Sequence, residues 1–113
     1  HKLKVLILGP NSFAITLNEL EPFLKFIPLF SISDTSFDVI LFHNKALHHT
    51  ENKILIKKSI VPKICAVNSK EKMNDYDACL ELPTSINFLN SVVTDVLAKN
   101  KFYQNSSINI KNY

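Results

Sequence analysis

Short apolar runs alternate with polar segments along this chain, and five of them are nearly continuous. Continuous apolar runs of this length are typical of strands buried on both faces of a parallel sheet. The first run ends at Gly9-Pro10, and we expect it to be the central strand. The five strands are predicted at residues 4–8, 26–32, 37–42, 63–67 and 78–82.

Three segments have helical spacing instead. Phe13, Leu17 and Leu20 follow the helix-start signal Asn11-Ser12 and predict a short amphipathic helix before Pro22. Residues 45–60 predict a second helix, although the Ile54-Leu55-Ile56 run is also compatible with a strand. A third helix is predicted at residues 85–99, capped by Thr84 or Ser85.

The connections between these elements indicate the fold. Only four polar residues, 33–36, separate the second and third strands, too few for a crossover helix. Either the second strand is shorter than its apolar run, or the helix has collapsed to a turn. The segment 68–77 has room for one or two helical turns. The alternation predicts an α/β fold: a doubly wound, flavodoxin-like parallel sheet of five strands flanked by short helices, with the helix between strands 2 and 3 reduced or missing.

Composition places the chain among globular proteins. Its 113 residues are 46% hydrophobic and 20% charged, which fits one domain with one core. No apolar run approaches the roughly 18 residues of a membrane helix, and the N-terminus has no hydrophobic signal core, so we expect a cytoplasmic protein outside the membrane. Cys65 and Cys79 have apolar neighbours and are expected to be reduced thiols.

Charge and glycine content exclude several functions. All 13 basic residues are lysine, so the chain lacks the arginine fork that reads guanine, and we expect no direct reading of DNA by this segment. Gly9 is the only glycine, whereas phosphate-binding loops need several. We therefore expect no nucleotide and no cofactor.

The ends of the strands, where α/β sheets place their sites, have few reactive side chains. They are Gly9-Pro10, His43-Asn44, Val67-Asn68 and Leu82-Pro83, with no nucleophile and base pair, so an enzyme is disfavoured. His43, His48 and His49 lack cysteine or carboxylate partners at metal-ligand spacing. We expect no metal and interpret them as solvated loop histidines, with a pH-sensitive His43 as a further hypothesis.

Four segments together resemble the receiver domain of response regulators over residues 2–99. They are Val-Leu-Ile-Leu at 5–8, Asp-Val-Ile-Leu-Phe-His at 38–43, Pro-Lys-Ile-Cys-Ala-Val at 62–67 and Asp-Ala-Cys-Leu-Glu-Leu-Pro at 77–83. The resemblance implies the receiver fold. It also assigns each position of the family's phosphoacceptor site to a residue of this chain.

None of the assigned positions carries the family's residue. The acidic pair that holds magnesium falls on Gly9 and Pro10, and the phosphoacceptor aspartate falls on His43. The switch hydroxyl falls on Val67, or near Ser69 if the register slips by two, and the lysine before Pro83 falls on Leu82. Phosphoryl transfer needs a metal and a cation to offset charge on the phosphoryl oxygens. The resemblance therefore implies a pseudo-receiver with a degenerate phosphoacceptor pocket.

The last helix and the segment after it suggest partners. The apolar residues of the helix sweep about half its circumference, wider than the roughly 100° stripe that a surface helix buries. Either this helix is deeply packed, or part of it contacts another chain. The resemblance implies a homodimer surface formed by Cys79, where the family has its aromatic switch residue, together with Phe88, Leu89, Val92 and Val96.

Residues 100–113 are either a linker or tail, or the start of an output domain. The alternation of Ile108 and Ile110 with polar residues resembles the opening strand of the winged-helix domain in OmpR/PhoB-type regulators. We therefore expect a phosphorylation-independent domain of an orphan response regulator that dimerises and controls an attached DNA-binding domain. The alternative is a stand-alone protein-interaction adaptor in signalling that has no DNA output.

Overall fold

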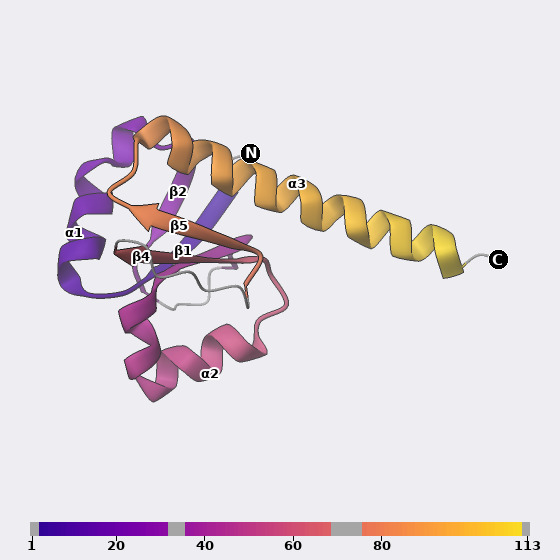
Figure 1. The fold of residues 1–113 in the computed structure, drawn as a ribbon, viewed down its shortest axis with the longest axis horizontal. Helices are drawn as coiled ribbons and strands as arrows, with labels where there is room; N and C mark the ends of the chain where they lie inside the picture. The colour runs from indigo at the N-terminus through magenta and orange to yellow at the C-terminus, as the bar shows by residue number, and fades with distance from the viewer. Residues whose placement is uncertain (1–2, 32–35, 69–75, 112–113) are drawn as a thin grey trace.

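The computed structural model describes residues 3–31, 36–68 and 76–111, with side chains as far as residue 100. Five parallel strands form one sheet in the order β2-β1-β3-β4-β5 (Figure 1). This order reverses direction at β1, as in flavodoxin-like sheets, and confirms the predicted doubly wound α/β fold. The strands are β1 (Leu3–Leu8), β2 (Phe26–Leu29), β3 (Val39–His43), β4 (Lys63–Asn68) and β5 (Ala78–Leu82).

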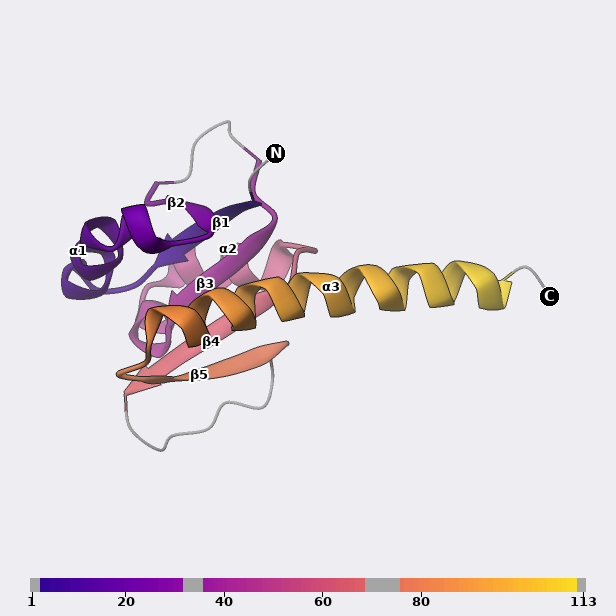
Figure 2. The ribbon, with the colours of Figure 1, turned by 90° about the horizontal axis from the view of Figure 1, so that it is seen from above.

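Helices cover both faces of the sheet. α1 (Asn11–Glu19) and α3 (Ile86–Lys111) pack on one face, and α2 (Thr50–Lys58) packs on the other (Figures 1 and 2). Two short 3-10 helices, η1 (Glu21–Phe23) and η2 (Asn44–His48), precede β2 and α2. The face under α1 and α3 is called the α1/α3 face below, and the other is called the α2 face.

Alternation along each strand divides the core between the two faces. On β3, Val39 and Leu41 belong to the α1/α3 face, whereas Ile40 and Phe42 belong to the α2 face. Successive strand residues point to opposite sides, and both sets are fully buried because helices cover both faces. The near-continuous apolar runs in the sequence follow from this two-sided burial.

Two aspartates fix the register at the start of two strands. The backbone N–H of Lys4 donates to the Asp38 carboxylate (2.9 Å), and the Asp38 N–H donates to the Lys4 carbonyl (2.8 Å). Lys63 and Asp77 repeat this pattern between β4 and β5, at 2.8 and 3.0 Å. Each aspartate immediately precedes its strand, so its side chain satisfies a strand-end N–H on the neighbouring strand.

The connection from β2 to β3 was predicted to lack a normal helix. β2 ends at Leu29, earlier than the predicted residue 32, and the described residues between the two strands contain no helix. Pro28 is tolerated within β2 because β2 lies at the edge of the sheet. Most of the segment 68–77, for which one or two helical turns were predicted, lies outside the described residues.

The helix predicted within residues 45–60 is confirmed over α2, so Ile54-Leu55-Ile56 is helical and the alternative strand is excluded. Two local predictions are corrected. No side chain caps α1, whose N-cap residue is Pro10, so Asn11-Ser12 does not cap it. The predicted strand at Ile108 and Ile110 is wrong, because α3 continues to Lys111. No glycine or proline interrupts residues 86–111, and extending an existing helix costs less than starting a new element.

The predicted cap of α3 is confirmed at one of the two positions proposed. The backbone N–H of Phe88 donates to the Ser85 hydroxyl at 3.1 Å. α3 extends well past the sheet at its C-terminal end (Figure 2). Within the described ranges, no helix combines the length and the apolar character that a membrane crossing requires.

Candidate functional site

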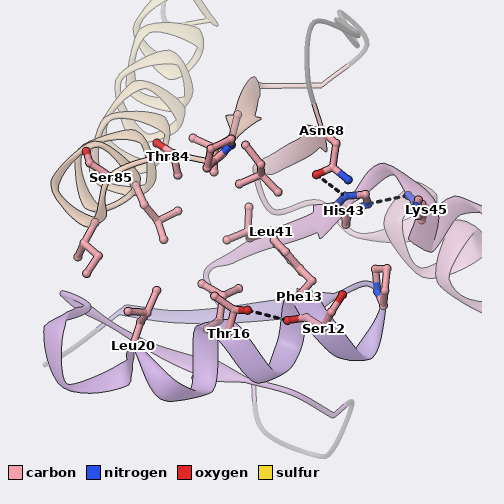
Figure 3. A pocket seen from close by; sticks show the side chains of 17 residues that line it. Ser12, Phe13, Thr16, Leu20, Leu41, His43, Lys45, Asn68, Thr84 and Ser85 are labelled. Atoms are coloured by element: carbon pink, nitrogen blue, oxygen red, sulfur yellow. Dashed lines mark hydrogen bonds between the residues drawn. The ribbon is translucent and has the colours of Figure 1, made fainter.

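A cavity of about 400 Å³ opens at the C-terminal edge of the sheet, on its α1/α3 face. It lies between α1 and the first turn of α3, with β3, β4 and β5 behind it (Figure 3). This edge is where open α/β sheets place their functional sites. The residues that line it are Pro10, Ser12, Phe13, Thr16, Leu17, Leu20, Leu41, His43, Lys45, Asn68, Leu80, Leu82, Pro83, Thr84, Ser85, Ile86 and Leu89.

The structure brings together four of the five residues of the predicted degenerate pocket. Pro10, His43 and Leu82 line the cavity, and Gly9 lies against His43. Val67 does not belong to this group, because it is buried in the core of the α2 face. Its assignment to the pocket is therefore corrected.

Asn68 takes the place predicted for Val67. The register pairs His43 with Ala66, so residue 67 points to the opposite face and residue 68 returns to the face of His43. The carboxamide Oδ1 of Asn68 lies 3.4 Å from His43 Nε2 (Figure 3). The sequence marked Asn68 as a strand end, but only the register shows that its side chain joins the site.

His43 is buried at the end of β3 and is uncharged in this arrangement, so its interpretation as a solvated loop histidine is wrong. Its side chain is 4% exposed, and its Nδ1 accepts a hydrogen bond from the backbone N–H of Lys45 at 3.1 Å. Because an accepting Nδ1 carries no proton, the ring proton lies on Nε2 and points toward Asn68. The imidazole thus acts as the N-cap of η2.

Close packing around His43 explains the one glycine of the chain. The ring of Phe13 meets the imidazole edge-on, with 5.6 Å between ring centroids. A Cβ atom at Gly9 would lie 3.0 Å from both His43 Cβ and Phe13 Cδ2, which is closer than carbon atoms normally approach. Glycine is favoured here both by this lack of space and by its backbone angle φ of +158°, which residues with a side chain rarely adopt.

The cavity has an apolar floor and an uncharged polar rim, apart from one cation. Of its lining residues only Lys45 has a charged side chain, and none carries a carboxylate. Among the described residues no three histidines, cysteines or acids gather as a metal site. Magnesium requires oxygen ligands in an octahedral shell, and these lining residues provide no anionic oxygen for it.

The predicted dimer residues separate into two groups. Leu89 and Val96 are 4% and 6% exposed and belong to the core of the α1/α3 face. The prediction that Leu89 and Val96 form a dimer surface is therefore wrong. Val92 is half-buried against the same core, whereas Phe88 is 54% exposed on α3 and Cys79 is exposed on the edge strand β5. Phe88 and Cys79 are the two predicted interface residues that remain on the surface.

Two further histidines among the described residues lie outside the cavity. His48 and His49 are exposed, at the end of η2 and just before α2. Neither lines the cavity.

No protein-family model and no curated protein matches this chain. The function proposed below is therefore argued from the fold and from the residues at the C-terminal edge of the sheet.

Proposed function

We propose that this chain is a phosphorylation-independent, receiver-like regulatory domain that dimerises and controls an attached DNA-binding domain in transcription regulation. One observation carries the proposal. The β2-β1-β3-β4-β5 sheet ends, at β3, in a buried neutral His43 and not in a carboxylate. The fold resembles that of a receiver, while the position that would accept a phosphoryl group has a structural role.

The geometry around His43 argues against phosphotransfer. A nucleophilic imidazole needs a free ring nitrogen, but Nδ1 accepts the Lys45 N–H and Nε2 faces Asn68. A phosphoryl group also needs cations or metal to balance its charge. The lining residues supply one lysine and no metal ligand set of the kind that receivers use.

The shape of α3 supports an attached output domain. The helix begins beside the cavity and continues to Lys111, well beyond the edge of the sheet (Figure 1). A domain that followed it would be carried on a continuous helix. Phe88 lies in the first turn of this helix, and its exposed ring is available for pairing with a second copy.

The first experiment tests the absence of phosphorylation. The protein is treated with acetyl phosphate or beryllofluoride in the presence of magnesium, and its backbone amide NMR spectrum is compared before and after. We expect no change at His43 or Asn68. A phosphorylatable receiver treated in parallel serves as the positive control. Saturable shifts at these two residues would contradict the proposal.

The second experiment tests dimerisation. Sedimentation velocity should show a dimer that Phe88→Asp dissociates and that Asn87→Asp, an exposed neighbour on α3, leaves intact. A wild-type monomer at high concentration means that the dimer proposal is wrong. A winged-helix pattern in the coding sequence beyond Tyr113 supports the DNA-linked function, whereas a stop codon there contradicts it and leaves the adaptor function.

A further inference from the structure

We propose that the cavity between α1 and the start of α3 binds a small organic anion with an apolar body. This inference rests on the proposed function for its regulatory meaning, because the ligand would occupy the edge where receivers hold a phosphoryl group. The binding itself follows from three properties of the cavity: its size, its apolar surface and the sign of its charge.

Size and surface set the body of the ligand. At about 400 Å³ the cavity lies toward the lower end of the volumes found for small-molecule sites, and such sites are mostly apolar with a few polar groups. Leu41 and Leu80 lie on the sheet beneath the cavity and are completely or almost completely buried, so the apolar surface open to a ligand comes mainly from the residues above them. Leu20 from α1 and Ile86 from α3 complete the apolar walls. A compact hydrocarbon or aromatic body matches this surface.

Charge sets the head of the ligand. Lys45 is the one lining residue with a charged side chain, and no acid lines the cavity to neutralise it. His43 adds no charge, because its Nδ1 accepts an N–H. Lys45, His43 and Asn68 lie together at one end of the cavity (Figure 3). This distribution favours one orientation of the ligand, with its carboxylate at that end and its apolar body toward Leu20 and Ile86.

Two helix ends add to the positive potential. Both α1 and α3 begin at the rim of the cavity, and the N-terminal end of a helix carries a partial positive charge. Neither helix has an acidic residue in its first turn. No side-chain hydrogen bond caps α1, where Pro10 stands at the N-cap position. The same surroundings therefore disfavour a cationic ligand.

The test compares three probes with one body and different heads: phenylbutyrate, phenylbutanol and phenylbutylamine. Binding is followed by amide NMR shifts of the whole chain. We expect phenylbutyrate to bind with a dissociation constant of about 1 mM or tighter, with shifts at Leu41, Leu80 and Asn68. The alcohol should bind at least about threefold more weakly, and the amine more weakly still. Equal binding of the three, tightest binding of the amine, or no binding of the acid overturns the inference.

Variants locate the site. Thr16→Trp places a large ring in the cavity from an exposed position on α1, and we expect it to abolish binding of all three probes. Asn18→Trp adds the same ring to the same helix outside the cavity and should leave binding unchanged. If both variants bind phenylbutyrate as the wild type does, the probe binds elsewhere and the inference is wrong.

A second pair of variants tests the role of charge. Lys45→Gln keeps the backbone N–H that His43 accepts. It should lower the ratio of acid affinity to alcohol affinity, while the two helix ends preserve part of that preference. Lys58→Gln removes an exposed lysine of α2 outside the cavity and should leave that preference unchanged. An unchanged preference in Lys45→Gln contradicts the assigned head position. These results are independent of the phosphodonor experiment, so failure of ligand binding and failure of the proposed function can be told apart.

Discussion

The side-chain Nδ2 of Asn90, on α3, donates a hydrogen bond to the backbone carbonyl of Phe23 at 3.2 Å. The same side chain accepts, through Oδ1, the backbone N–H of Lys25 at 2.9 Å. Asn90 is 5% exposed, so both bonds lie in a protected environment. One carboxamide thus satisfies two backbone groups at the entrance to β2 and fixes α3 against a segment more than 60 residues earlier.

Asn90→Ala should lower the free energy of unfolding by about 2–3 kcal/mol, because it leaves the Phe23 carbonyl and the Lys25 N–H without their partner. Asn90→Asp should cost at least as much, since a carboxylate cannot donate to the carbonyl. Urea denaturation gives both values. Asn87→Ala, at an exposed position of the same helix, is the control and should change stability by less than about 0.5 kcal/mol. Similar losses in Asn87→Ala and Asn90→Ala would mean that the bridge contributes nothing specific.

Gly9→Ala should destabilise the protein by about 1–3 kcal/mol, because the new methyl group overpacks the space shared by Phe13 and His43 and because alanine rarely adopts a φ of +158°. Shortening Phe13 to leucine removes one of the two close atoms. In Phe13→Leu the additional cost of Gly9→Ala should therefore be smaller than in the wild type, a coupling that a double-mutant cycle in urea measures. Strictly additive losses would show that the steric contact does not determine the choice of glycine.

The two cysteines, which are register partners on β4 and β5, should react very differently. Burial of Cys65 raises the pKa of its thiol from 9.0 to about 12, with a smaller contribution from the neighbouring Cys79. Cys79 is exposed. At about pH 8 iodoacetamide should modify Cys79 rapidly, and Cys65 only as fast as the protein opens. Mass spectrometry of the digested protein distinguishes the two sites, and equal rates would contradict the buried position of Cys65.

The raised pKa of Cys65 in the folded chain also predicts a loss of stability at alkaline pH. Between pH 9 and pH 12 the unfolded chain loses the Cys65 proton while the folded chain keeps it. The folded state then binds more protons, so the free energy of unfolding falls as the pH rises through this range. Cys65→Ala should flatten this fall, and Cys79→Ala should leave it nearly unchanged.

Much of the fold could be predicted from the sequence, because the strands are buried on both faces. The central strand β4 is a short apolar run of this kind, and the predicted bounds, 63–67, differ from the observed ones by a single residue. The end of α3 could not be predicted in this way. Ile108 and Ile110 alternate with polar residues as in a strand, but the preceding helix continues through them. Local periodicity does not include the advantage of extending a helix that already exists.

The candidate site was only partly predictable. Its position could be predicted because open α/β sheets place their sites at the C-terminal ends of the strands. Pro10, His43 and Leu82 were predicted there, and all three line the cavity. The exchange of Val67 for Asn68 depends on how β4 pairs with β3, and a shift of one residue reverses the face of every side chain. The role of His43 as a cap for η2 depends on the backbone after β3, which leaves no pattern in the sequence.

The length of α3 has a mechanical consequence. Its 26 residues form a rod of about 39 Å, at about 1.5 Å per residue. The rod is anchored on the sheet at one end and projects freely at the other (Figure 2). Core contacts hold the helix as far as Leu97, so a tilt of about 5° there would move the tip, about 21 Å further on, by about 2 Å. The packed half borders the cavity at Ile86, so a small tilt of this half becomes a larger displacement at the far end.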